Sequence, residues 1–107
     1  MNLIQKHIEV IKTLCEQHKV ERLYVFGSVL TDKFNENSDV DFLVKFGEVD
    51  LFDYFDNYMN LKEALEKLLQ RPVDLLEEQT LKNPILKKSI NKTKKLIYGG
   101  AGRKVAA

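Results

Sequence analysis

The chain has 107 residues, of which 44% are hydrophobic and 31% charged, and its net charge is +1 at pH 7. This length fits one small domain, and this composition is typical of a globular chain rather than a disordered one. A net charge so close to zero offers no overall attraction to nucleic acid, so direct nucleic-acid binding is not expected. The single cysteine, Cys15, excludes an intramolecular disulfide and a cysteine-based zinc site. With no apolar run long enough to span a membrane and no secretory leader pattern, we expect a cytoplasmic protein without membrane contact.

The first part of the chain predicts a helix and a strand that ends in a tight turn. Residues 3–18 carry apolar side chains at spacings of three and four, which predicts one amphipathic helix. Residues 22–26 are β-branched and aromatic, which predicts a strand, and Gly27-Ser28 ends it. Glycine lets a backbone come close to a ligand, and a turn that opens into a helix presents free N–H groups to phosphate oxygens. Gly27 and Ser28 are therefore candidate phosphate-binding residues.

Two carboxylates begin the next strand. After a polar connector at 31–38, residues 39–46 alternate so that Asp39 and Asp41 share one face and apolar side chains share the other. Carboxylates on one face repel each other unless a cation lies between them, and such hard oxygen ligands suit Mg²⁺. Gly-Ser alone usually marks only a turn, and Asp-x-Asp alone is often the polar side of a strand. Their combination, with a ten-residue spacer between two strands, predicts a metal-dependent nucleotide site.

The second half of the chain predicts a long helix, a strand, a helix and a closing strand. An apolar stripe from Leu51 to Leu69 is interpreted as packing on the sheet, although exposed aromatic residues at its edge could serve a partner protein. Arg71-Pro72 ends this helix, and residues 73–77 form a strand in which Asp74 is an isolated acid among apolar residues. A helix over 80–91 and an edge strand over 94–98 follow. The predicted inward residues of that helix are Leu81, Ile85, Leu86 and Ile90.

These elements predict an α/β fold in the order α-β-α-β-α-β-α-β, with a small mixed β-sheet flanked by helices. The domain covers residues 1–99, and residues 100–107 are interpreted as a disordered tail that cloning could have added. The strand ends would bring the glycine turn and the acids to one edge of the sheet. The lysine-rich stretch Lys82–Lys95 is interpreted as a solvated helix face, with a surface for triphosphate, RNA or an acidic partner as the alternative.

The pairing of Gly27-Ser28 with Asp39 and Asp41 resembles the signature of the DNA polymerase beta-like nucleotidyltransferase superfamily. The small size is similar to that of the MNT-type minimal nucleotidyltransferases, the antitoxin partners of HEPN-domain toxins. The resemblance covers about residues 1–100. Many members carry an Arg-Gly pair soon after the Gly-Ser, where this chain has the stretch 29–32, Val-Leu-Thr-Asp. This departure keeps the signature residues but argues against an extra basic contact to phosphate from that loop.

The resemblance implies a polymerase-beta-like fold and identifies Asp74 as the third carboxylate, with catalytic and metal-binding roles for Asp39, Asp41 and Asp74. It implies two Mg²⁺ ions, ATP as substrate with its phosphates held by Gly27 and Ser28, and transfer of AMP to a tyrosine hydroxyl of a HEPN-type ribonuclease toxin in a hetero-oligomer. Two alternatives remain. One is a non-catalytic antitoxin that acts by binding, and the other is a small-molecule nucleotidyltransferase similar to aminoglycoside-modifying enzymes, which usually carry an additional helical domain.

Overall fold

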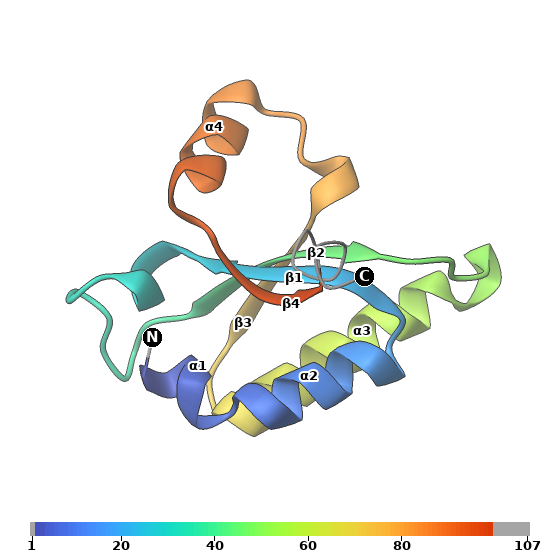
Figure 1. Ribbon diagram of the computed structural model, residues 1–107, viewed down its shortest axis with the longest axis horizontal. Coiled ribbons are helices and arrows are strands. Elements are labelled where there is room, and N and C mark those ends of the chain that lie inside the picture. Colours follow the sequence, from blue (N-terminus) through green and yellow to red (C-terminus); the bar gives the residue numbers. More distant parts are fainter. Residues whose placement is uncertain (1, 100–107) are drawn as a thin grey trace.

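The computed structural model describes residues 2–99, which contain a four-stranded sheet and helices on both of its faces (Figure 1). The strands are β1 (Val20–Phe26), β2 (Val40–Phe46), β3 (Val73–Glu77) and β4 (Lys95–Gly99). The helices are α1 (Asn2–Lys6), α2 (Ile8–Gln17), α3 (Leu51–Leu69) and α4 (Pro84–Thr93), with short 3₁₀ turns η1 (Gly27–Leu30) and η2 (Glu78–Thr80). The predicted tail, residues 100–107, lies outside the described residues.

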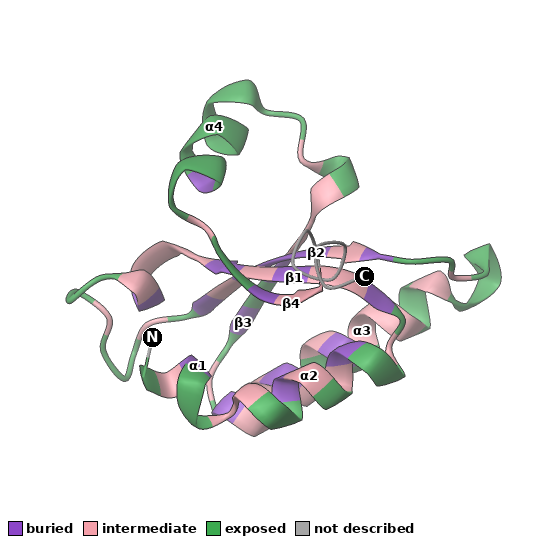
Figure 2. Ribbon diagram, in the orientation of Figure 1, coloured by how far each residue is buried: buried purple, intermediate pink, exposed green. Residues whose placement is uncertain are grey.

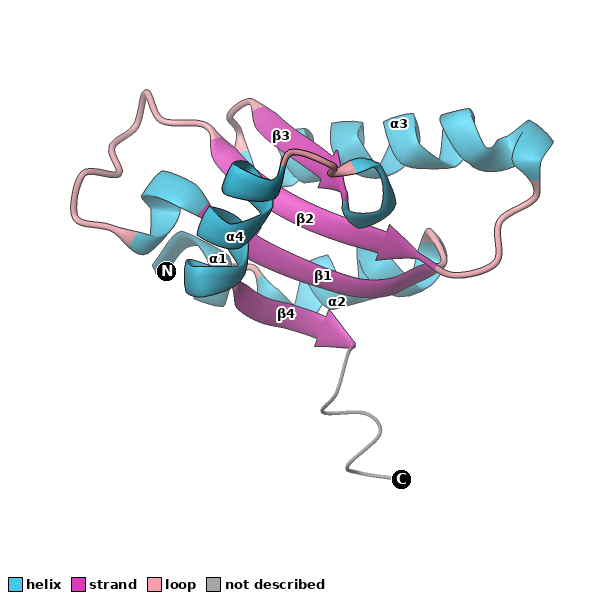
Figure 3. Ribbon diagram, turned by 90° about the horizontal axis from the view of Figure 1, so that it is seen from above, coloured by secondary structure: helices cyan, strands magenta, loops and turns pink. Residues whose placement is uncertain are grey.

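The sheet is mixed, as predicted, with the strand order β3-β2-β1-β4 (Figure 3). β1 pairs antiparallel with both β2 and β4, whereas β2 and β3 are parallel. A parallel pair needs a long crossover connection, and α3 supplies it between β2 and β3. The crossover places the start of β3 beside the start of β2.

The core lies between the sheet and the layer formed by α1, α2 and α3 (Figures 1 and 2). Along β2, the predicted apolar face of Val40, Phe42 and Val44 is fully buried. Leu61 and Leu65 of α3 are buried in the same cluster. α4 lies on the opposite face of the sheet (Figures 1 and 3). Within residues 2–99, no helix combines the length and the apolar character that crossing a membrane requires.

The two long helical predictions need correction at their beginnings. The helix predicted over 3–18 is broken at His7, whose φ of −113° and ψ of 16° depart from helical values. α3 begins at Leu51, the first residue of the predicted stripe, because the Asp50 carboxylate caps it by accepting from the Phe52 N–H. Its first turns pack on the sheet only in part: the Tyr54 ring lies 5.5 Å from the Phe46 ring of β2, whereas Phe52 is 91% and Phe55 69% exposed. The packed face therefore begins at Tyr54 and excludes the predicted members Leu51, Phe52 and Phe55.

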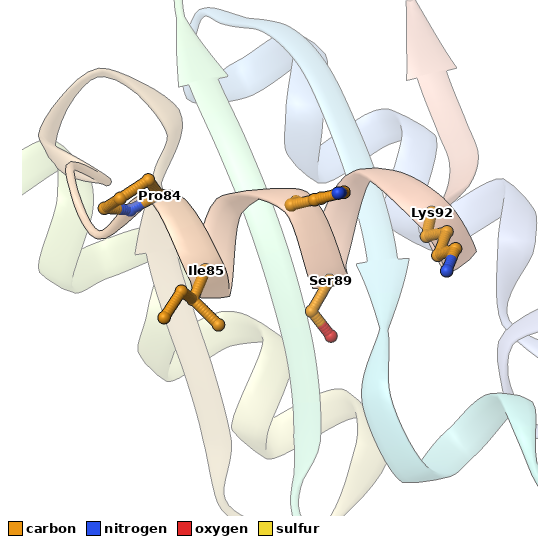
Figure 4. A pocket seen from close by; sticks show the side chains of 5 residues that line it. Pro84, Ile85, Ser89 and Lys92 are labelled. Carbon is orange, nitrogen blue, oxygen red and sulfur yellow. The ribbon is translucent and has the colours of Figure 1, made fainter.

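The prediction for the last helix was wrong in its start and in most of its inward face. α4 begins at Pro84, because the Asn83 side chain accepts from the backbone N–H groups of Ile85 and Leu86 and so forms the N-cap. Ile85 is 81% exposed and Leu86 43%, and the helix buries only Ile90. Ile85, Ser89 and Lys92 project from one side of α4 and line an open groove of about 530 Å³ (Figure 4). None of the predicted site residues lines that groove.

Candidate active site

The sheet register brings the predicted acids and the glycine turn together. Asp41 pairs with Phe26 on one side and with Asp74 on the other, so it lies between the end of β1 and the start of β3. Asp39 lies immediately before β2, two residues from Asp41, and β1 leads directly into Gly27. The structure therefore places all five predicted site residues at one end of the sheet.

Gly27 is required by its backbone conformation and by the closeness of Asp41. Its φ is +81°, in the left-handed region that side chains with a Cβ rarely adopt. A Cβ at this position would collide with Oδ2 of Asp41 and lie 3.1 Å from Cγ of the same side chain. The corner thus holds the Asp41 carboxylate directly against the backbone at the end of β1.

Ser28 belongs to η1, the single 3₁₀ turn that follows this corner. Its carbonyl accepts from the Thr31 backbone N–H at 2.9 Å and from the Thr31 hydroxyl at 2.8 Å, which closes the turn. Within residues 2–99, the Ser28 hydroxyl has no hydrogen-bond partner. It is therefore free to donate to a ligand at the same end of the sheet.

The three acids form a cluster of like charges. Asp41 is half-buried, while Asp39 and Asp74 are exposed. Burial raises the pKa of the Asp41 carboxyl above its ordinary value, and the nearby carboxylates of Asp74 and Asp39 raise it further. None of the three carboxylates forms an ion pair or hydrogen bond with another residue of the described chain. Their charge is thus not compensated by any side chain of residues 2–99.

The donor set fits Mg²⁺ held jointly with a substrate. Within the described residues, no three His, Cys, Asp or Glu side chains are arranged as a ready-made metal cage. Mg²⁺ seldom uses such cages, because it usually takes one or two carboxylates and completes its shell with water and substrate phosphates. The neighbouring carboxylates of Asp39, Asp41 and Asp74, beside the Gly27 corner, are ligands of this kind.

One residue beside the site escaped the sequence analysis. Arg71, interpreted there only as part of a helix end, lies against the 31–38 connector. Its Nη1 donates to the carbonyl of Asn35 at 3.0 Å and to that of Ser38 at 3.1 Å. Its guanidinium carbon lies 4.6 Å from the centre of the Phe34 ring, a cation–π contact. The two carbonyls are 36 and 33 positions from Arg71, so no local sequence pattern marks the contacts.

A second arginine, Arg22, forms an ion pair with Glu78 at the other end of β1. Nε and Nη2 of Arg22 donate to the two carboxylate oxygens of Glu78 at 3.1 and 2.7 Å. Arg22 pairs with Lys45 in the sheet register, whereas Asp41 pairs with Phe26 near the opposite end of both strands. This ion pair is therefore separate from the acids.

Comparison with known proteins identifies the family. Residues 9–101 match the family described as polymerase beta, nucleotidyltransferase. The chain belongs to this nucleotidyltransferase family. The membership confirms the resemblance inferred from the glycine corner and the acids, and it confirms the predicted class of enzyme.

Two relatives of this nucleotidyltransferase carry names that specify an activity. One, from Methanocaldococcus jannaschii, is provisionally named protein adenylyltransferase MJ1379, and it is 36% identical over 90% of each chain. The other, protein adenylyltransferase MntA of Thermococcus cleftensis, is 41% identical over 71% of this chain and 74% of the relative. The first similarity extends over nearly the whole of both chains.

Solved structures share the fold. One provisionally described as a minimal nucleotidyltransferase has a TM-score of 0.71 and 34% identity, covering 86% of this chain and 90% of that chain. A crystal structure of a toxin–antitoxin with AMP-PNP has a TM-score of 0.69 and 22% identity, covering 90% of this chain and 76% of that one. The small mixed sheet with helices is therefore the polymerase beta-like nucleotidyltransferase fold.

Proposed function

We propose that this nucleotidyltransferase is a Mg²⁺-dependent protein adenylyltransferase of the cytoplasm. It would transfer AMP from ATP to a tyrosine hydroxyl of a HEPN-type ribonuclease toxin and so act as its antitoxin. The observation that carries the proposal is the uncompensated set of Asp39, Asp41 and Asp74 beside the Gly27 corner. The names of the two relatives, both protein adenylyltransferases, support a protein as the acceptor.

The glycine corner and the acids divide the work of holding the nucleotide. The backbone N–H of Gly27 and the free hydroxyl of Ser28 would donate to the β- and γ-phosphates, which leave together as pyrophosphate. Asp39 and Asp41 would hold Mg²⁺, with Asp74 as the ligand on the acceptor side. When bound, the metal supplies positive charge that offsets the charge of the phosphates during displacement. The raised pKa of Asp41 indicates that its environment favours neutralisation of its charge.

The proposed reaction is an in-line displacement at the α-phosphorus. The tyrosine oxygen forms a bond to that phosphorus while the bond to the oxygen bridging the α- and β-phosphates breaks. The hydroxyl proton passes to a base, and Asp74 is the candidate because its exposed carboxylate lies at the rim of the site next to Asp41. Positioning and charge neutralisation would supply most of the rate enhancement in such a reaction.

The partner would complete the site. The domain has a single sheet layer with the acids at its end, and two of the three carboxylates are exposed. A protein that presents its tyrosine to Asp74 could reach them without entering a deep cavity. A solved toxin–antitoxin that contains AMP-PNP shares the fold of this chain, and that likeness is consistent with nucleotide transfer within a complex.

The test is co-expression with a HEPN-type toxin, followed by intact-mass measurement of the toxin and by transfer from α-labelled ATP in Mg²⁺ and in EDTA. We expect mass increments of AMP with wild type and none with Asp41→Asn. Glu63→Gln on the exposed face of α3 removes the same charge away from the site, and this control should transfer normally. Co-purification of both proteins without label would instead support an antitoxin that acts by binding, and label on an added small molecule but not on the toxin would support the other alternative.

A further inference from the structure

We infer that Arg71 is a positioning residue for nucleotidyl transfer, because its guanidinium fixes the backbone next to Asp39. Arg71 touches none of the three acids through any hydrogen bond or ion pair of the described chain. Arg71 would act by holding the 31–38 connector, and its role in catalysis rests on the proposed function. The hydrogen bonds between Arg71 and the connector do not depend on the proposed function.

Both peptide groups that flank Asp39 are held by the dipeptide Arg71-Pro72. On one side, the carbonyl of Ser38 accepts from Arg71 Nη1 at 3.1 Å. On the other side, the backbone N–H of Val40 donates to the carbonyl of Pro72 at 3.2 Å. The φ and ψ angles of Asp39 lie between these two fixed peptide planes, so the direction in which its carboxylate leaves the backbone is set from both sides.

The part of the connector that Arg71 contacts, residues 35–38, is a turn closed by its own hydrogen bonds. The Ser38 backbone N–H donates to the Asn35 carbonyl at 3.0 Å, and the Asn35 N–H donates to the Ser38 hydroxyl at 3.1 Å. The Asn37 N–H donates to the Asn35 side chain at 2.8 Å. Because Arg71 Nη1 donates to the carbonyls at both ends of this turn, it holds the turn as one unit. The Phe34 ring against the guanidinium fixes the plane of the donor.

The same dipeptide leads directly into β3, which carries Asp74. Arg71 therefore ties the segment that bears Asp39 to the strand that bears Asp74. Without it, the exposed loop before Asp39 would lose both hydrogen bonds to Arg71, and the Ser38–Asp39 peptide group would no longer be held from outside the loop. Groups that orient metal ligands from outside the coordination shell typically affect metal affinity or activity about 10–100-fold.

The experiment compares Arg71→Ala, Arg71→Lys and the matched control Arg22→Ala. The control removes an arginine with three side-chain hydrogen bonds at the other end of the sheet. Hydrogen exchange is read on peptides covering 34–42 and, for reference, 8–17. Mn²⁺ affinity is measured in the presence of AMP-PNP, and the Mg²⁺ dependence of transfer is measured with the partner. We expect Arg71→Ala to speed exchange over 34–42 alone, to weaken Mn²⁺ binding about tenfold and to raise the Mg²⁺ requirement similarly. Arg22→Ala should change none of these.

The lysine variant keeps a cation but lacks the planar donor that lies against Phe34, so we expect a smaller change in the same direction. If Arg71→Ala fails to fold, the lysine variant decides the question. A folded variant at Arg71 whose loop exchange and Mn²⁺ affinity match wild type would overturn the inference. If wild type transfers no nucleotide while Arg71→Ala loosens the loop and weakens Mn²⁺ binding, the proposed function fails and the positioning role stands.

Discussion

Replacing Gly27 with alanine tests whether the corner and Asp41 form one unit. The backbone φ of +81° would cost a residue with a Cβ about 1–2 kcal/mol. The new methyl group would also force the Asp41 carboxylate away, since Oδ2 occupies its place, and an off-rotamer side chain costs about 1 kcal/mol. The sum is about 2–3 kcal/mol, which in a domain of this size lowers Tm by roughly 10–20 °C. Displacement of a ligand carboxylate by about 1 Å would reduce transfer about 100-fold.

Thermal unfolding by circular dichroism and transfer of labelled AMP would measure the two effects. Gly47→Ala is the matched control, because Gly47 does not have a positive φ and its Cβ would make an ordinary 3.4 Å contact with the Lys19 carbonyl. It should leave transfer unchanged. In an Asp41→Ala background the carboxylate is absent, so Gly27→Ala should lower stability only through the strained backbone φ. The stability loss caused by Gly27→Ala should therefore be about 1 kcal/mol smaller in that background than in wild type. Equal losses in both backgrounds, or wild-type transfer by Gly27→Ala, would refute the reasoning.

The shifted pKa values of Asp41, Glu78 and Cys15 can each be tested. The raised pKa of Asp41 means that the folded state holds this proton more tightly than the unfolded state, so the stabilisation is present below the ordinary pKa of 3.8 and is lost as pH rises through the folded value. Asp41→Asn should therefore melt above wild type at pH 7 without metal, by a margin that shrinks toward pH 3, and an unchanged margin would contradict this. The Arg22 hydrogen bonds lower the pKa of Glu78, so their stabilisation is present above the ordinary value of 4.5 and is lost as pH falls through the lower folded value. Glu78→Gln should cost about 0.5–1 kcal/mol in urea titrations at pH 7, and less in acid, with transfer unaltered. Burial raises the pKa of the Cys15 thiol to about 12, so iodoacetamide at pH 8 should label the native protein far more slowly than the urea-unfolded protein, and equal rates would show that Cys15 is accessible.

Features encoded locally could be predicted from the sequence. The alternation of β2 placed Asp41 opposite its buried neighbours, and the strand that bears Asp74 followed from Pro72 and the short apolar run after the long helix. The glycine corner was predictable because few residues other than glycine tolerate its φ. Each of these signals depends on residues close to one another in the chain.

Features that depend on distant neighbours could not be predicted. The apolar residues Phe52 and Ile85 have helical spacing with the rest of their stripes, yet they remain exposed in the folded chain. The start of α4 did have a local signal, Asn83 followed by Pro84, which the apolar spacing obscured. The contacts of Arg71 with the connector are set by the tertiary fold, and arginine at a helix end is too common to suggest them.

The parallel pairing of β2 with β3 also bears on when the protein becomes competent during synthesis. Asp41 and Asp74 become neighbours only after the nineteen residues of α3 have folded back across the sheet. A polypeptide halted before Asp74 contains at most two of the three site carboxylates, Asp39 and Asp41, and lacks β3, which pairs with their strand. The catalytic site should therefore form only late in folding, and enzymatic activity should report whether folding is complete.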